Sequence, residues 1–190
     1  MIYTPEDSEI EFFTIKGVGA FVFTLCVIMP AEILILTTGG TIDKVYFDAK
    51  SNYRIGNPQI TEILQHVGVS VPYVIKTLLA KDSMELTEQD RDCIRDGVCQ
   101  ATQRCILITH GTDTMITTAR HLQPVRDKTV VLVGALMPAR FKSSDAEFNI
   151  GFALAAVQIL PNGVYLAMNG QIFNPEEVQK NIAANRFEPV

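Results

Sequence analysis

The stretch "ILILTTGGTIDK", residues 33–44, holds the pattern that decides the fold. Four apolar residues are followed directly by two threonines, by the pair Gly39 and Gly40, and by a third threonine. A short apolar run that ends at glycine is typical of a buried parallel strand followed by a tight turn. The pattern therefore predicts a first strand over about residues 33–37 and a polar loop over residues 39–57.

Similar apolar runs recur along the chain, and segments with helical spacing of apolar residues lie between them. Further strands are predicted over residues 72–79, 104–109, 129–134 and 163–170. Helices are predicted over residues 58–66, 87–103, 113–123 and 144–160, and Thr87 and Asp90 are spaced like a capping pair at the start of the second. A last helix is predicted from Asn174, with Pro175 at its first position. Strands that alternate with helices predict an α/β fold: an open, mainly parallel sheet with helices on both faces, a flavodoxin- or Rossmann-like three-layer arrangement.

One domain accounts for most of the chain. Its 190 residues, of which 47% are hydrophobic, suffice for one compact unit with a sizeable core but not for two. Residues 29–190 are assigned to this domain. Residues 1–28 begin acidic and end apolar, and Met29 stands just before the first strand. We expect residues 1–28 to be an extension from an upstream start codon, and a signal anchor is the alternative.

Charge and cysteine content exclude several classes of function. The chain has 16 Lys and Arg residues against 21 Asp and Glu residues, a net charge of −5. This balance gives no general attraction for nucleic acid or anionic lipid, so we predict neither as a partner. The four cysteines form no Cys-x-x-Cys pair. They predict reduced, buried thiols in a cytoplasmic protein and no metal site.

The loop after the first strand allows three interpretations. It contains neither a Gly-x-Gly-x-x-Gly fingerprint nor a P-loop, so phosphate binding has little support. A plain tight turn and the seat of a nucleophile both stay open. Hydroxyl residues gather just past the predicted strand ends: Thr37, Thr38, Thr41, Ser83, Thr112 and Thr114. A threonine needs a nearby base to become a nucleophile, and the candidates are Asp113, Lys180, Tyr53 and His110, the last equally suited to orienting its loop.

Several motifs carry a family resemblance. They are "TGGTI" (38–42), "KSNYRIG" (50–56), "HGTDTM" (110–115), "VLVGALMP" (131–138), "MNGQIF" (168–173) and "VQKN" (178–181). In order and spacing they resemble the amino-terminal domain of the bacterial-type L-asparaginases, over residues 33–181. The resemblance implies hydrolysis of the side-chain amide of L-asparagine to L-aspartate and ammonia, without a metal or a cofactor.

The resemblance also implies roles for individual residues. Thr41 would be the primary nucleophile, with Tyr53 as its partner. Thr112, Asp113 and Lys180 would form a second polar triad that moves protons. The substrate-binding set that the resemblance implies is Gly40, Ser83, Gly111 and Asp113, with Ser83 on the α-carboxylate and Asp113 on the α-ammonium.

Three features depart from the family pattern. The chain ends at Val190, without the smaller carboxyl-terminal domain, and Met84 and Asp43 stand where a polar and a small residue are common. Two hypotheses follow. One is a minimal amidohydrolase, a homo-oligomer whose interface replaces the missing domain. The other is a non-catalytic amino-acid-binding or regulatory module that keeps the pocket without useful turnover.

Overall fold

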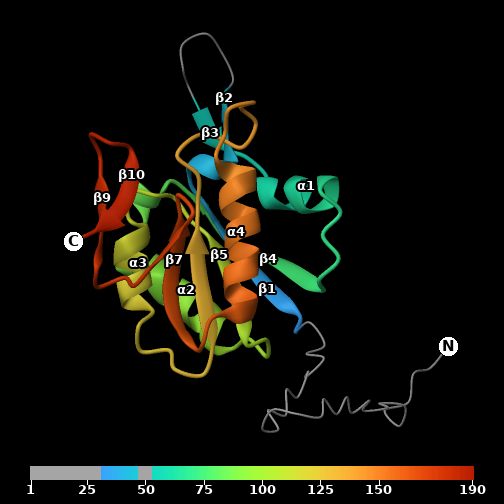
Figure 1. Ribbon diagram of the computed structural model, residues 1–190, viewed down its shortest axis with the longest axis vertical. Coiled ribbons are helices and arrows are strands. Elements are labelled where there is room, and N and C mark those ends of the chain that lie inside the picture. The colour runs from blue at the N-terminus through green and yellow to red at the C-terminus, as the bar shows by residue number, and fades with distance from the viewer. Residues whose placement is uncertain (1–30, 47–52) are drawn as a thin grey trace, which may run out of the picture.

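A six-stranded sheet forms the centre of the molecule (Figure 1). The computed structural model describes residues 31–46 and 53–190, so the expected boundary at Met29 lies outside the described residues. In sheet order the strands are β4 (Tyr73–Lys81), β1 (Ile33–Gly39), β5 (Cys105–Thr109), β6 (Thr129–Val133), β7 (Gly163–Met168) and β8 (Gln171–Phe173). Neighbouring strands are parallel except for β7 and β8. The predicted open, mainly parallel sheet is confirmed.

Helices cover both faces of this sheet. They are α1 (Gln59–His66), α2 (Glu88–Cys99), α3 (Met115–His121) and α4 (Ala146–Ile159). Alternate side chains of the strands point to opposite faces. In β1, Leu34 and Leu36 pack into the core beneath α2 and α3, whereas Ile33 and Ile35 pack into the core beneath α1 and α4. The molecule thus has the three layers that the sequence predicts.

One crossover differs in hand from the others. The steps from β5 to β6 and from β6 to β7 run in the same direction across the sheet. Their helices nevertheless lie on opposite faces, because α3 packs with the α2 core and α4 with the α1 core. The two crossovers therefore have opposite hands, and the β6–α4–β7 unit is the exception to the usual right-handed rule. This exception places α4 on the α1 face.

The predicted last helix is wrong. Asn174 and Pro175 open only a turn, in which the Glu177 amide donates to the Asn174 carbonyl at 3.0 Å. The chain then forms a hairpin of β9 (Val178–Asn181) and β10 (Arg186–Pro189). Val178 and Phe187 from its two strands are buried in the core, and a helix at this place would withdraw them. Core burial overrides the local helix-start signal.

The loop predicted over residues 39–57 also contains regular structure. A 3-10 turn, Thr41–Asp43, leads into β2 (Lys44–Tyr46), which pairs with β3 (Tyr53–Ile55) in an antiparallel hairpin. Residues 47–52, between the two strands, are outside the described part of the chain. The amide of Gly56 donates to the Asp43 carbonyl at 2.8 Å, which fastens the hairpin to the turn.

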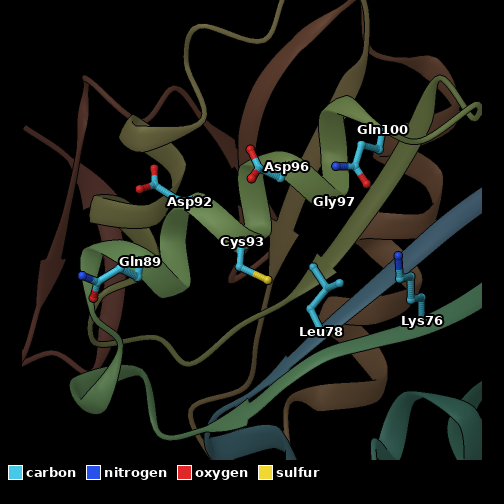
Figure 2. Close-up of a pocket in the computed structure, with 8 residues that line it drawn as sticks. All are labelled: Lys76, Leu78, Gln89, Asp92, Cys93, Asp96, Gly97 and Gln100. Atoms are coloured by element: carbon cyan, nitrogen blue, oxygen red, sulfur yellow. The ribbon is translucent and has the colours of Figure 1, made fainter.

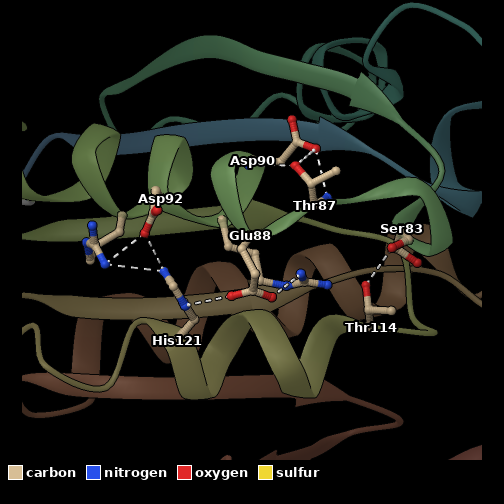
Figure 3. A network of polar contacts seen from close by, with 9 residues as sticks. Ser83, Thr87, Glu88, Asp90, Asp92, Thr114 and His121 are labelled. Carbon is tan, nitrogen blue, oxygen red and sulfur yellow. Dashed lines mark hydrogen bonds and ion pairs between the residues drawn. The ribbon is translucent and has the colours of Figure 1, made fainter.

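Helix α2 begins with the predicted cap, whose contribution to the stability of the fold can be measured. Thr87 accepts from the Asp90 amide, and the Asp90 carboxylate accepts from the Thr87 amide, so the predicted capping pair is present (Figure 3). Thr87→Ala should lower the free energy of unfolding by about 1 kcal/mol, measured by urea denaturation, because the Asp90 amide at the helix end loses its side-chain acceptor. Thr102→Ala, at an exposed threonine outside the cap, is the matched control and should change it by less than about 0.5 kcal/mol. Equal effects would contradict this account.

Candidate active site

Three loops meet at the carboxyl edge of the sheet, where the polar motifs follow β1, β4 and β5. Gly40 and Gly111 lie so close that a Cβ on Gly40 would come within 2.4 Å of the Gly111 backbone. A Cβ on Gly111 would come within 2.6 Å of the Ser83 side chain. No side chain larger than hydrogen fits at these contacts, and Gly40 also has a φ of 92° that favours glycine. The glycines therefore let the three loops touch.

Hydrogen bonds fix the same three loops to one another. The Gly40 amide donates to the Lys81 carbonyl at 3.0 Å, and Thr38 Oγ1 donates to the Thr109 carbonyl at 2.9 Å. Thr114 Oγ1 donates to the Ser83 carbonyl at 2.7 Å (Figure 3). The hydroxyls of Thr38 and Thr114 are thus engaged in holding backbone, which makes them supporting residues.

Thr41 begins the 3-10 turn directly after the glycine contact. Its side chain is half-buried, and within the described ranges its hydroxyl has no hydrogen-bond partner. Backbone bonds hold the turn: the Asp43 amide donates to the Gly40 carbonyl at 3.1 Å, the Ala139 amide donates to the Ile42 carbonyl at 3.1 Å, and the Lys44 amide donates to the Thr41 carbonyl. Thr41 therefore offers an accessible hydroxyl on a fixed backbone.

Thr112, Asp113 and Lys180 come together across 67 and 68 residues of sequence. Lys180 Nζ donates to Thr112 Oγ1 at 2.8 Å and to Asp113 Oδ1 at 2.6 Å. Thr112 is buried and Asp113 is exposed. The strand pairing of β9 with β10, in which Lys180 stands opposite Phe187, positions the ammonium. A Lys ammonium has only donors, so it holds the hydroxyl and the carboxylate in one fixed arrangement.

Tyr53 lies in a second polar group beside the site. Its hydroxyl donates to Asp82 Oδ2 at 3.4 Å, and Lys44 Nζ lies 4.0 Å from the centre of its ring. Lys44 and Asp82 form an ion pair at 2.8 Å. Burial raises the pKa of Asp82, but hydrogen bonds from Lys44 and the Met84 amide outweigh it and lower that pKa below its usual value. The predictions missed Lys44, the last residue of the stretch 33–44, and Asp82, which directly precedes Ser83.

Ser83 is almost completely buried, and its hydroxyl has no hydrogen-bond partner among the described residues. It begins a short 3-10 turn whose N-cap is Asp82, with the Met84 amide donating to Asp82 Oδ1 at 3.1 Å. Met84 points outward, with 70% of its surface exposed. A buried hydroxyl without a protein partner lowers the stability of the fold unless a ligand forms a hydrogen bond with it. An unpartnered hydroxyl of this kind is typical of a ligand-binding residue.

His110 is buried and contacts its own loop. The ring is fully buried, and Nδ1 lies 2.8 Å from the Gly111 carbonyl oxygen. Burial lowers the pKa of His110 to about 4, an effect that the nearby Arg91 charge reinforces and the Gly111 contact opposes. A neutral imidazole that donates to Gly111 stabilises the backbone just before Thr112.

Asp43 is a buried carboxyl two residues after Thr41. Only 2% of its surface is exposed, and its Oδ1 accepts from the Gln59 amide at 2.8 Å, at the start of α1. Burial raises the pKa of Asp43 to about 6, and the bond from Gln59 opposes this rise. Asp43, which departs from the family pattern, thus ties the turn at Thr41 to the first turn of α1 through the bond from the Gln59 amide.

A groove elsewhere on the molecule is not part of this site. It lies between the edge strand β4 and α2, lined by Lys76, Leu78, Gln89, Asp92, Cys93, Asp96, Gly97 and Gln100 (Figure 2). None of these residues belongs to the three loops at the carboxyl edge of the sheet.

Within the described part of the chain, no group of three His, Cys, Asp or Glu residues could hold a metal ion.

Comparison with known proteins defines the class of protein. A family model described as "Asparaginase, N-terminal" matches residues 32–188. L-asparaginase 2 of Escherichia coli (strain K12) is 34% identical over an alignment that covers 90% of this chain and 53% of that protein. A glutaminase-asparaginase of Acinetobacter glutaminasificans is 33% identical, covering 66% of this chain and 38% of that protein. The thermostable L-asparaginase from Thermococcus kodakarensis superposes with a TM-score of 0.73 at 28% identity, covering 84% of this chain and 51% of that one.

The chain belongs to the asparaginase family, and the part that matches is the amino-terminal domain of that family. It spans about half the length of L-asparaginase 2 and of the Thermococcus structure, and less of the Acinetobacter relative. The predicted resemblance is thereby confirmed. Among the helices that the structure describes, none has the length and apolar character needed to cross a membrane.

Asp43 should give the fold a characteristic pH dependence. Since its pKa is higher in the folded chain than the ordinary 3.8, the folded state binds the extra proton, and stability falls as the pH rises from about 4 to about 6. Asp43→Asn keeps an acceptor for the Gln59 amide and does not ionise. Its free energy of unfolding, relative to wild type, should therefore increase by about 2 kcal/mol between about pH 4 and pH 7.

Urea denaturation over this pH range measures the difference. Glu147→Gln, at an exposed carboxyl on α4, is the matched control and should show no comparable trend. A difference between Asp43→Asn and wild type that stays constant with pH would show that Asp43 titrates normally in the folded chain.

Proposed function

We propose that this domain hydrolyses the side-chain amide of L-asparagine to L-aspartate and ammonia. The observation that carries the proposal is the contact of Lys180 with both Thr112 and Asp113. These two residues directly follow Gly111, and Thr41 directly follows Gly40, which touches Gly111. Two hydroxyls, an ammonium and a carboxylate thus share one edge of the sheet. These groups suit acyl transfer to a hydroxyl nucleophile.

The substrate would be held at both charged ends. The buried, unpartnered hydroxyl of Ser83 suits the α-carboxylate, and the exposed carboxylate of Asp113 suits the α-ammonium. Gly40 and Gly111 let the backbones of two loops meet beside Ser83, and the proposed role of these two residues is to border the substrate with backbone groups. Fixing both ends of a small zwitterion brings its side-chain amide to a defined place, and such orientation supplies much of the rate.

Thr41 would attack the amide carbon. Its oxygen forms a bond to that carbon, the C–N bond breaks, and the threonine proton leaves on the nitrogen as ammonia. Water then cleaves the aspartyl ester and restores the hydroxyl. Tyr53 is the proposed partner of Thr41, and the proposed role of Thr112, Asp113 and Lys180 is to pass protons and to offset developing negative charge.

Location and assembly complete the proposal. We propose a cytoplasmic homo-oligomer, with residues 29–190 as the asparaginase-like domain and residues 1–28 as an extension. The unpaired thiols of Cys93, Cys99 and Cys105 support a reducing compartment. Cys93 and Cys99 are exposed, so the prediction that these thiols are buried is wrong. Met84 and Ile182 flank the site, are largely exposed, and are suited to contact with another chain.

Loss of either threonine should abolish most of the activity. Thr41→Ala removes the proposed nucleophile, and Thr112→Ala removes one of the two partners of Lys180. Each should lower kcat for ammonia release from L-asparagine by about 10³-fold with little change in the urea midpoint. Thr117→Ala, at an exposed position of α3, is the control and should retain full activity. Activity within about threefold of wild type in Thr41→Ala would overturn the assignment of the nucleophile.

Ser83 should act mainly through binding. Ser83→Ala removes a donor for the α-carboxylate and should raise KM by about 10-fold to 100-fold, with a smaller effect on kcat. Ser143→Ala, an exposed serine in the loop before α4, is the matched control. An unchanged KM in Ser83→Ala would refute its role in substrate binding.

The amino-acid-binding alternative has a distinct outcome in the same experiments. If calorimetry shows that wild type binds L-asparagine while it releases no more ammonia than Thr41→Ala, the domain is a binding module. Glutamine and D-asparagine in parallel assays establish which amide the site prefers.

A further inference from the structure

Asp82 directly precedes Ser83 and bonds to two different parts of the site. Its Oδ1 accepts from the Met84 amide at 3.1 Å, which caps the 3-10 turn that begins at Ser83. Its Oδ2 accepts from the Tyr53 hydroxyl at 3.4 Å and forms the ion pair with Lys44 Nζ at 2.8 Å. One carboxylate therefore joins the turn that carries the proposed α-carboxylate ligand to the hairpin that carries Tyr53.

The charge on Asp82 fixes the direction of the bond to Tyr53. Burial raises the pKa of Asp82, yet the bonds from Lys44 and the Met84 amide lower it overall, so the group is ionised at neutral pH. An ionised carboxylate only accepts hydrogen bonds. The hydrogen of the Tyr53 hydroxyl is therefore directed to Asp82, and the lone pairs of the phenol oxygen remain for another donor.

Lys44 completes the arrangement from the hairpin side. Lys44 stands opposite Ile55 in the pairing of β2 with β3, so Lys44 and Tyr53 are diagonal neighbours on one face of the hairpin. The ammonium lies 4.0 Å from the centre of the Tyr53 ring, which attracts it, and the side chains of Lys44 and Asp82 are each only 14% exposed. Lys44 thus holds the ring and the carboxylate together, three residues after Thr41.

We propose that Asp82 is a positioning residue for amide hydrolysis, through its bonds to the Tyr53 hydroxyl and to the turn of Ser83. The inference rests on the proposed function, in which Tyr53 is the partner of Thr41. With its own hydrogen directed to Asp82, the phenol oxygen accepts a hydrogen bond from the Thr41 hydroxyl as that hydroxyl attacks. No proton passes to Asp82, and the threonine proton still leaves on the nitrogen.

The two bonds of Asp82 act on different kinetic constants. The bond to the Met84 amide holds the turn of Ser83, so its loss affects substrate binding and KM. The bond from the Tyr53 hydroxyl orients the proposed partner of the nucleophile, so its loss affects kcat. At 3.4 Å this second bond is long, and hydrogen bonds in active sites commonly shorten when the substrate binds.

Substitutions of Asp82 separate the two bonds. Asp82→Asn keeps a carbonyl oxygen for the Met84 amide but turns its NH2 group toward Tyr53 and Lys44. It should lower kcat for ammonia release from L-asparagine by about 10-fold to 100-fold and change KM by less than about threefold. Asp82→Ala also removes the cap and should raise KM by about 10-fold in addition. Asp127→Asn, at an exposed carboxyl just before β6, is the matched control and should keep both constants.

A double variant tests whether Asp82 acts through the phenol. Tyr53→Phe removes the hydroxyl that Asp82 orients, so adding Asp82→Asn to it should lower kcat by less than about twofold further. Urea midpoints measured on the same samples report on the fold. A kcat of Asp82→Asn equal to that of wild type, or losses that multiply in the double variant, would overturn the inference while amide hydrolysis itself stands.

Calorimetry with L-aspartate, the expected product, makes the test independent of turnover. Asp82→Asn should bind it within about threefold of wild type, whereas Asp82→Ala should bind it about 10-fold more weakly. Equal affinities of Asp82→Ala and wild type would refute the role of Asp82 toward Ser83. A wild type that releases no ammonia would refute the proposed function and the role of Asp82 toward Tyr53, and the binding data would still decide its role toward Ser83.

Discussion

The contact between Gly40 and Gly111 is the constraint on which the candidate site depends. It lets the loops after β1 and β5 touch. Thr41 directly follows Gly40 in one loop, and Thr112 directly follows Gly111 in the other. A methyl group on Gly40 would lie 2.4 Å from the Gly111 backbone and would force the two loops apart. The places proposed for Thr41 and Thr112 beside the substrate follow from this close approach of the two loops.

The second constraint is the hairpin of β9 and β10. It brings Lys180 to Thr112 and Asp113 from far along the chain, and the burial of Val178 and Phe187 holds it against the core. The ammonium is therefore located by apolar packing as well as by its ion pair. Stability and proposed chemistry are coupled here, since loosening the hairpin would separate the charged groups.

The sequence predicted the layers well and the irregular segments poorly. The first strand, the Thr87 cap and the alternation of strands and helices follow from local spacing, and all three are present. The gathering of polar loops at one edge follows from parallel strands. The last helix from Asn174 was a wrong prediction, because its start signal is local whereas the burial of Phe187 depends on the whole fold. The link between Lys44 and Asp82 was missed because it joins two loops that only the folded sheet brings together.

The central claim is that Thr41 carries the acyl group during asparagine hydrolysis, and mass spectrometry of the acid-quenched protein during turnover of L-asparagine tests it most directly. The account predicts a mass increase of one aspartyl group, located after digestion on the peptide that contains Thr41. An adduct on the peptide that contains Thr112, or ammonia release through a route that leaves every peptide unmodified in the pre-steady state, would contradict it.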